Sequence, residues 1–312
     1  MTQPPHPIRR ATQTHALVAL AVAAAAYAGA LLYLQRQPGF SLAEPLFLLA
    51  VLGIAFPLLA WGLTRRPRGA APVGPGHDRA RLPAVLLYLA VFAALVLGWG
   101  FSAIQQAVPG EPAQSIVQVL VKLATMVLLP LVLFTEWRRR RVGPLGRGRL
   151  LLVFAVMSLA YLGMQAVFGR GLTTLSALAP AASTLAWAIP ACFLWQTIEA
   201  GLAEEVLFRR VLQEQFAIAI GSQVAAIAWA SLLFGLAHAP GLWMRGAHAM
   251  EGVAQASPGW AVAYSIVMIA PAGIAFGVLW ARTRSLMLLV PLHGMVDLVP
   301  QLAPFIRAWT GG

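Results

Sequence analysis

The sequence predicts an all-helical protein with many membrane-spanning helices, and three observations predict that fold class. Of the 312 residues, 60% are hydrophobic and only 10% are charged, and the mean hydropathy is +0.77. Long apolar runs recur along the chain, and short arginine-rich clusters lie between some of them. A water-soluble domain does not have so few charges on its surface. We therefore expect the lipid bilayer to be the solvent for most of this chain.

The lengths of the apolar runs predict the number of spans, because a helix needs about 20 apolar residues to cross a bilayer. Each run has to be helical, since irregular backbone or an open sheet edge facing lipid leaves polar groups without hydrogen bonds. The sequence therefore predicts one polytopic bundle of about eight or nine spans. The runs are Ala16–Leu34, Leu42–Leu63, Pro83–Ala107, Ile116–Phe134, Leu150–Phe168, Thr184–Phe208, Ser222–His238, Trp260–Ala281 and Leu286–Phe305.

The first run has an alternative interpretation as a cleaved signal peptide. Arg9 and Arg10 precede it, and Ala26–Ala28 has the small-residue pattern of a cleavage site. The run continues to Leu34 and so reaches the length of a membrane span. We favour a span.

Clusters of arginine predict the topology, because basic loops stay on the cytoplasmic side of the membrane. Two apolar runs separate the two main clusters, so both clusters fall on one side, and the N-terminus is predicted inside as well. Lys122 is the single lysine among 22 basic residues, a bias that suggests a bacterial source and hence the bacterial inner membrane. The clusters contain Arg65, Arg66, Arg68, Arg79 and Arg81, and Arg138 to Arg141, Arg147 and Arg149.

The charge and the cysteine count exclude other classes of partner and site. The net charge of +12 comes from clusters between apolar runs, not from one exposed basic face, so we expect no nucleic-acid partner. Cys192 is the single cysteine, which excludes an internal disulfide and a zinc site made of several thiolates. Any metal would need histidine and carboxylate ligands.

Buried acidic residues are concentrated late in the chain. The sequence has only ten acidic residues, yet Glu199, Glu204, Glu205 and Asp297 all fall within or against predicted spans. An ionisable residue at the centre of a membrane helix costs about 2.5–3.5 kcal/mol on insertion scales, and such residues usually face a bundle interior or a water-filled cavity. These carboxylates are therefore candidates for function.

The segment from Glu204 to Arg209 has the sequence EEVLFR. Adjacent residues lie about 100° apart around a helix, whereas Glu205 and Arg209, four residues apart, share a face and can form an ion pair. That pairing would leave Glu204 as the candidate general base. The alternative is an ordinary structural pair near the membrane interface.

Two histidines lie in the same third of the chain. His293 and Asp297 share one helical face, where they can cooperate in binding a water, a metal ion or an oxyanion. Phe234 begins the segment FGLAH, which ends on His238 at the end of another apolar run. A hydrogen-bonded core histidine is the alternative interpretation of His238.

These motifs together resemble the CPBP family of intramembrane proteases, which is also described as the CAAX protease and bacteriocin-processing, or Abi, family. The order E-E-x-x-x-R, F-x-x-x-H and H-x-x-x-N/D is matched from Glu204 to Asp297. The segments Gly273–Gly277, Thr283–Leu286 and Pro291–His293 resemble the family's approach to its last motif. The resemblance covers residues 196–300. Many members have Asn where this chain has Asp297, and an ionised Asp cannot donate a hydrogen bond.

The resemblance implies an intramembrane endopeptidase in which Glu204 and His238 activate a water and His293 and Asp297 stabilise the oxyanion. Glu205 belongs to the same catalytic group, whereas Arg209 and Phe234 have structural or ion-pairing roles. We favour no obligatory metal, with zinc on Glu204, His238 and His293 as the alternative. The expected partners are the lipid bilayer and a hydrophobic peptide, a peptide precursor or a membrane protein.

The chain is then divided into residues 1–182, N-terminal spans of unassigned role, and residues 183–312, the catalytic membrane core. Two other function classes stay open at this point. One is a transporter or proton-coupled carrier that uses the buried carboxylates, for which no mirrored second half is evident. The other is a non-catalytic immunity or scaffold protein with the same fold. The sequence does not predict the oligomeric state.

Overall fold

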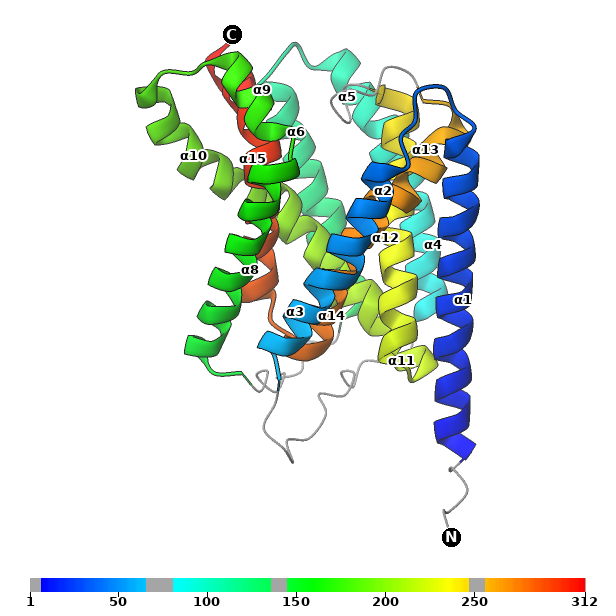
Figure 1. The fold of residues 1–312 in the computed structure, drawn as a ribbon. Helices are drawn as coiled ribbons and strands as arrows, with labels where there is room; N and C mark the ends of the chain where they lie inside the picture. The colour runs from blue at the N-terminus through cyan, green and yellow to red at the C-terminus, as the bar shows by residue number, and fades with distance from the viewer. Residues whose placement is uncertain (1–6, 66–80, 136–144, 247–255, 312) are drawn as a thin grey trace.

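The computed structural model describes residues 7–65, 81–135, 145–246 and 256–311, and over those residues the chain is helical with no strand. Figure 1 shows the helices side by side, most of them running between the same two ends of the molecule. Within the described residues, eight helices are long and apolar enough to cross a membrane. The predicted fold class, a polytopic helical bundle, is confirmed, and the chain is an integral membrane protein.

The N-terminal part contributes five of these spans. In several of them a π-helical segment (η) lies between two α-helical segments, which together form one continuous span. In chain order the five are α1 (Pro7–Gln35); α2 (Ala43–Leu48), η1 (Leu49–Ala55) and α3 (Phe56–Leu63); α4 (Leu82–Phe92), η2 (Ala93–Gly100) and α5 (Phe101–Ala107); α6 (Ala113–Lys122), η3 (Leu123–Leu128) and α7 (Leu129–Phe134); and α8 (Arg147–Phe168).

The C-terminal part contributes three spans and one bent helix that is not among the eight. The short helix α9 (Gly171–Leu178) precedes the bent helix, which contains the predicted run Thr184–Phe208. The bent helix comprises α10 (Ala182–Gln196), η4 (Thr197–Leu202), η5 (Glu205–Gln213) and α11 (Glu214–Ile220). The three spans are α12 (Gln223–Arg245); α13 (Pro258–Tyr264), η7 (Ser265–Ile269) and α14 (Ala270–Thr283); and α15 (Leu286–Thr310).

The C-terminal spans form the interior of the bundle. Between 17% and 28% of the apolar windows of the first five spans is buried inside the protein, against 44% to 56% for the last three. All nine residues of η5, Glu205–Gln213, are buried, although this segment contains charged and amide side chains. The N-terminal spans therefore surround a polar centre and present most of their apolar side chains to lipid.

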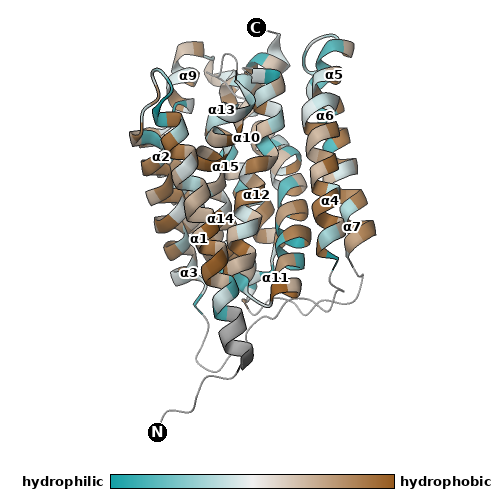
Figure 2. Cartoon of the chain, turned by 90° about the vertical axis from the view of Figure 1, so that its right-hand side faces the viewer, coloured by the Kyte–Doolittle hydropathy of each residue, from teal (hydrophilic) through white to brown (hydrophobic). Residues whose placement is uncertain are grey.

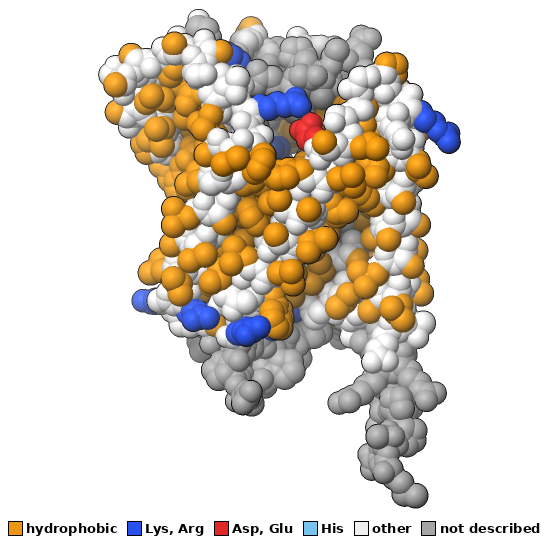
Figure 3. All heavy atoms as spheres, in the orientation of Figure 1, with side chains coloured by type: hydrophobic (Ala, Val, Ile, Leu, Met, Phe, Trp, Pro, Cys, Tyr) orange, Lys and Arg blue, Asp and Glu red, His pale blue; other side chains and the backbone are white. Residues whose placement is uncertain are grey.

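The surface has the distribution expected of a membrane protein. Figure 2 shows hydrophobic residues along most of the length of the helices. The face in Figure 3 has a broad hydrophobic belt, with basic side chains near its upper and lower margins. Large apolar side chains such as Leu87, Leu151 and Val132 are exposed by two thirds or more. This exposure is stable where lipid replaces water as the neighbouring solvent.

The described parts of the two arginine clusters lie on one side of the bundle, at the lower end of the view in Figure 1. Two of these arginines donate hydrogen bonds to the ends of neighbouring helices there. Arg149 Nε donates to the carbonyl of Leu63 at 2.9 Å, and Arg81 Nη1 donates to the carbonyl of Leu133. Arg65 directly follows the same helix end, and Arg147 opens α8 there. Arg66, Arg68, Arg79 and Arg138 to Arg141 lie outside the described residues. The cytoplasmic assignment of this side stays a prediction.

Serine caps set where the C-terminal spans begin. Ser222 accepts a hydrogen bond from the backbone N–H of Ala225, and Ser285 accepts one from that of Leu288. Such caps satisfy N–H groups that have no partner within the helix. Gly221, with φ of +72°, allows the tight turn between α11 and α12. These turns fix where the site helices enter the bundle.

Two glycines allow α14 and α12 to pack closely. A Cβ on Gly273 would lie 2.9 Å from the Cα of Ser231, and one on Gly277 would lie 3.0 Å from Ile227. Small residues four positions apart therefore let these two helices approach closely, a packing role that is common in membrane helices.

The sequence placed one helix end wrongly. The run Ser222–His238 was expected to end at the histidine, but α12 continues to Arg245 and places His238 inside the helix. The hydropathy of the sequence weakens after His238 because Pro240, Gly241 and Arg245 follow. These residues remain helical, and the position of His238 along the span is therefore not the position of a helix terminus.

Candidate active site

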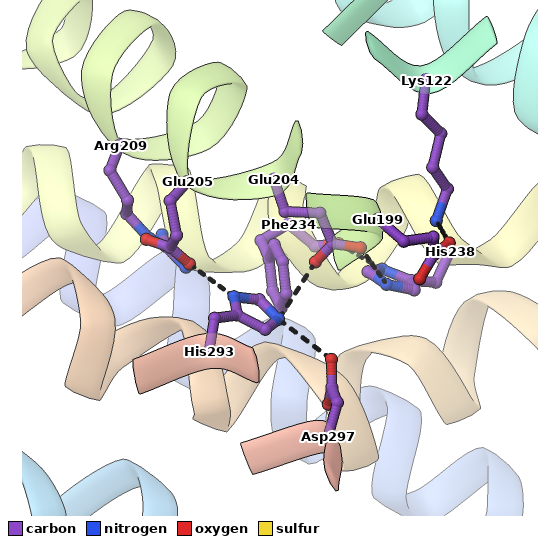
Figure 4. A network of polar contacts seen from close by, with 9 residues as sticks. All are labelled: Lys122, Glu199, Glu204, Glu205, Arg209, Phe234, His238, His293 and Asp297. Carbon is purple, nitrogen blue, oxygen red and sulfur yellow. Dashed lines mark hydrogen bonds and ion pairs between the residues drawn. The ribbon is translucent and has the colours of Figure 1, made fainter. Parts of the chain in front are cut away.

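Glu204 lies at the centre of the candidate site, where η4 and η5 meet (Figure 4). Its Oε1 lies 3.9 Å from Nε2 of His238, and its Oε2 lies 3.6 Å from Nε2 of His293. Both distances exceed those of direct N–H···O hydrogen bonds. The carboxylate therefore faces two imidazoles without being bonded to either of them, and its side chain retains 12% of its exposure. It can accept a proton from a third group.

His238 extends from α12 and has one ring nitrogen already engaged. Its Nδ1 lies 2.8 Å from the backbone carbonyl of Phe234, which can only accept, so Nδ1 carries the hydrogen. In the neutral ring, Nε2 is then a free acceptor that faces Glu204. The ring also packs edge-on against Phe234, with centroids 5.0 Å apart. Phe234 thus orients the imidazole in two ways.

His293 is held by a chain of buried charges. Its Nδ1 lies 2.8 Å from Oε1 of Glu205, whose Oε2 accepts from Nε of Arg209 at 3.3 Å. Glu205 and Arg209 are fully buried, so this pair forms in a region of low dielectric constant. The predicted Glu205–Arg209 pair is confirmed. Glu205 also fixes the orientation of His293, a contact that the spacing of the sequence could not predict.

Asp297 lies one turn beyond His293 on α15, as the sequence predicts. Its Oδ2 is 3.5 Å from Nε2 of His293. The same nitrogen therefore faces two carboxylates, those of Glu204 and Asp297. Figure 4 shows the five predicted residues converging from three helices: Glu204 and Glu205 from the bent helix, His238 from α12, and His293 and Asp297 from α15.

A second ion pair lies beside Glu204 and was not predicted as part of the site. Lys122, at the end of α6, pairs with Glu199 of η4, and both side chains are largely buried. Lys122 also interacts electrostatically with Glu204. The sequence does contain a signal, since Lys122 is a single charge inside the apolar run Ile116–Phe134 and is the chain's single lysine. Charges within spans usually have a functional or paired role.

Glycines bring the bent helix against α15 at the level of the site. A Cβ on Gly294 would overlap Thr197 Oγ1 and would lie 2.9 Å from Thr197 N. A Cβ on Gly201 would overlap the carbonyl oxygen of Val290. Because Gly201 lies three residues before Glu204 and Gly294 directly follows His293, their close contacts set the distance between Glu204 and the imidazole.

Glu204, His238 and His293 are the residues that the sequence offers as zinc ligands. Among the described ranges of the chain, no three His, Cys, Asp or Glu side chains are arranged as ligands of one metal ion. His293 and His238 each have Nδ1 engaged, by Glu205 and by the carbonyl of Phe234, which leaves both Nε2 atoms facing Glu204. The absence of an obligatory metal stays a prediction.

Comparison with known proteins identifies a family for part of the chain. Residues 185–299 match the family model described as type II CAAX prenyl endopeptidase Rce1-like. The predicted resemblance to the CAAX protease family is confirmed over this segment, which contains all but the first three residues of the bent helix, together with α12, α14 and the part of α15 with His293 and Asp297. No curated protein and no solved structure matches the chain. The family match supports an intramembrane endopeptidase as the general activity.

Proposed function

We propose that this chain hydrolyses peptide bonds of membrane-embedded or hydrophobic peptides with a water molecule that Glu204 activates. One observation carries the proposal: the carboxylate of Glu204 faces the Nε2 atoms of two histidines from separate helices, at 3.6 and 3.9 Å. A carboxylate near an imidazole can take the proton of a water as that water attacks a carbonyl carbon. The family match to an endopeptidase supports the same chemistry.

In the proposed reaction, Glu204 accepts a proton from the water, and the oxygen of the water forms a bond to the carbonyl carbon. The Nε2 lone pair of His238 orients the water. When the C–N bond breaks, Glu204 returns the proton to the leaving amine. The first step protonates Glu204 and the second deprotonates it, so the carboxylate acts first as a base and then as an acid, and the complete reaction returns the enzyme to its starting protonation state.

The carbonyl oxygen becomes an oxyanion, and we assign its stabilisation to His293. Three carboxylates, those of Glu205, Glu204 and Asp297, face the ring of His293, and their negative charge favours the imidazolium form, in which Nδ1 donates to Glu205 and Nε2 also has a hydrogen to donate. A preorganised donor of this kind contributes a factor of about 10²–10³ to the rate. Asp297 supports this imidazole through its carboxylate and does not itself donate to the oxyanion.

The experiment uses purified protein in lipid vesicles that contain hydrophobic peptides, with cleavage followed by mass spectrometry. We expect the parent to release new peptide ends, and Glu204→Gln to lose nearly all turnover while remaining folded in the membrane. Glu44→Gln is the matched control, because Glu44 is an exposed residue paired with Arg170 at the surface. Parent protein that moves protons or solutes across vesicles but releases no peptide ends would contradict the proposal and favour a carrier.

Metal dependence is measured in the same assay. We expect protein treated with a chelator to cleave at the rate of untreated protein, and added zinc to give no increase. Loss of cleavage on chelation, with recovery on addition of zinc, would show that a metal ion supplies the activation assigned here to Glu204 and His238.

A further inference from the structure

A polar pocket opens at the end of the bundle opposite the arginine clusters, away from the catalytic residues. Three elements surround it: the C-terminal end of α5, the start of α6 and the end of α12. Arg245 lies seven residues beyond His238, or about 10 Å along α12. The pocket therefore belongs to a different level of the membrane from that of the site. Its lining residues are Ser102, Gln105, Gln106, Gln114, Met244 and Arg245.

The lining provides one cation and several groups that can donate hydrogen bonds, and it contains no acidic side chain. Arg245 is half-buried, and its guanidinium lies over the ring of Phe101, 5.2 Å from the centroid. The buried Nε of Arg245 has no hydrogen-bond partner among the described residues. Glu199 attracts Arg245 electrostatically but is already paired with Lys122. Within the described residues, no acidic side chain of the pocket lining therefore competes with a ligand for the charge of Arg245.

The fold accommodates Arg245 in this position. A Cβ on Gly241 would lie 2.8 Å from Nη2 of Arg245, so the glycine allows the side chain to fold back along its own helix. A Cβ on Gly98 would lie 2.9 Å from Sδ of Met244. Stacking on Phe101 also restricts the guanidinium plane. Such preorganisation lowers the entropic cost of binding an anion with paired oxygen atoms.

Two exposed tryptophans place the pocket at the level of lipid headgroups. Trp99 is 65% exposed and precedes the α5 part of the lining, and Trp243 is 53% exposed and precedes Met244. Exposed tryptophans in membrane proteins gather at the boundary between the hydrocarbon core and water. Met244 and Gln106 are themselves exposed, so the pocket opens to the surface at that depth.

We propose that this pocket binds the phosphate group of an anionic phospholipid. Arg245 would pair with two phosphate oxygens, and the amides of Gln105 and Gln106 would donate to the headgroup. A headgroup without a cation suits the site best, because a choline group would bring a second positive charge towards Arg245. The site joins the N-terminal spans to the family-matched core, and one lipid there would bridge the two.

The test is native mass spectrometry of the full chain extracted from vesicles that contain phosphatidylglycerol and phosphatidylcholine. We expect the parent to retain one phosphatidylglycerol in preference to phosphatidylcholine, and Arg245→Gln to lower this retention at least about tenfold, because hydrogen bonds to charged groups are the strong ones. Arg36→Gln is the matched control, since Arg36 is exposed at the same end of the molecule outside the pocket. It should retain the lipid as the parent does.

Three results would overturn the proposal. The first is equal lipid retention by the parent and Arg245→Gln. The second is displacement of the lipid by equimolar inorganic phosphate, which would indicate a site for a soluble anion. The third is unchanged lipid retention with an increased KM for a peptide, which would indicate a substrate subsite. If Arg245→Gln does not fold, Gln106→Leu and Arg245→Lys replace it, and unchanged retention in both has the same meaning.

Discussion

The residues of the candidate site divide into those that face the reacting groups and those that position them. The carboxylate of Glu204 faces Nε2 of His238 and Nε2 of His293. On the other side of each ring, Nδ1 of His293 contacts Glu205, which pairs with Arg209, and Nδ1 of His238 contacts the carbonyl of Phe234. The positioning contacts are shorter, at 2.8 Å for both Nδ1 atoms, than the contacts between the facing groups. Rigid positioning beside loosely bonded reacting groups is what catalysis by preorganisation requires.

Substitutions at Asp297 test the role of its carboxylate, because many members of the family that the chain resembles have Asn at this position. Asparagine keeps an oxygen that can accept from Nε2 of His293, so Asp297→Asn should retain cleavage within about threefold of the parent. Asp297→Leu removes the acceptor and should lower kcat about 10²-fold, which is the order of an oxyanion donor's contribution. Peptidase kinetics of the two variants measure this. An Asn variant as slow as the Leu variant would mean that the negative charge is essential.

Among the elements, the bent helix from α10 to α11 most directly determines the geometry of the site. It carries both glutamates and packs against α15 along η4 and α10. All residues of its η5 segment are buried. One π-helical segment, η4, precedes Glu204, and another, η5, follows it. π-helical turns frequently occur at functional sites. The close packing at Gly201 and Gly294 sets the separation between this helix and His293.

A prediction for this contact compares two glycine substitutions. Gly294→Ala should lower the free energy of unfolding by about 1–3 kcal/mol, because the added methyl overlaps Thr197. It should also slow cleavage, since Glu204 and His293 would be pushed apart. Gly163→Ala in α8 is the control, where a Cβ meets nothing within 4 Å. That change should be neutral or stabilise by about 0.5–1 kcal/mol. Thermal unfolding in detergent would distinguish them, and equal effects would contradict the packing account.

The fold class of the whole molecule could be predicted from the sequence, because consecutive residues along the chain are enough to identify each apolar run. The apolar runs correspond to the described helices, and helix periodicity correctly paired Glu205 with Arg209 and His293 with Asp297. Contacts between distant helices could not be derived in that way. The Glu205–His293 bond and the Lys122–Glu199 pair depend on how helices from different parts of the chain cross.

The bent helix is a second feature that the local sequence pattern did not predict fully. Hydropathy predicted a simple span over Thr184–Phe208, but the segment continues as a helix to Ile220 and is not one of the eight candidate spans. Its charged and amide residues stay helical because the surrounding spans bury and pair them. Tertiary burial therefore overrides the local hydropathy at the position where the candidate site lies.

The topology gives a prediction for the whole molecule. Single cysteines at Arg65 and Gly148 should be labelled by a membrane-impermeant reagent only from the cytoplasmic side, and a cysteine at Arg36 only from the opposite side. All three positions are exposed. The native Cys192 is buried and so supplies an unlabelled background. Labelling of the Arg65 and Gly148 positions from outside would reverse the predicted orientation, and labelling from different sides would contradict the fold.

The central claim is that Glu204 and His238 act on one water in one step, and a double-variant cycle tests it most directly. Residues that act as a unit have strongly non-additive effects, so the second substitution costs little once the first has disabled the unit. We expect Glu204→Gln/His238→Ala, in vesicles with a cleavable peptide, to have the residual kcat of the slower single variant within about threefold. A double variant whose loss in rate equals the product of the two single losses would contradict the claim, because each residue would then contribute independently.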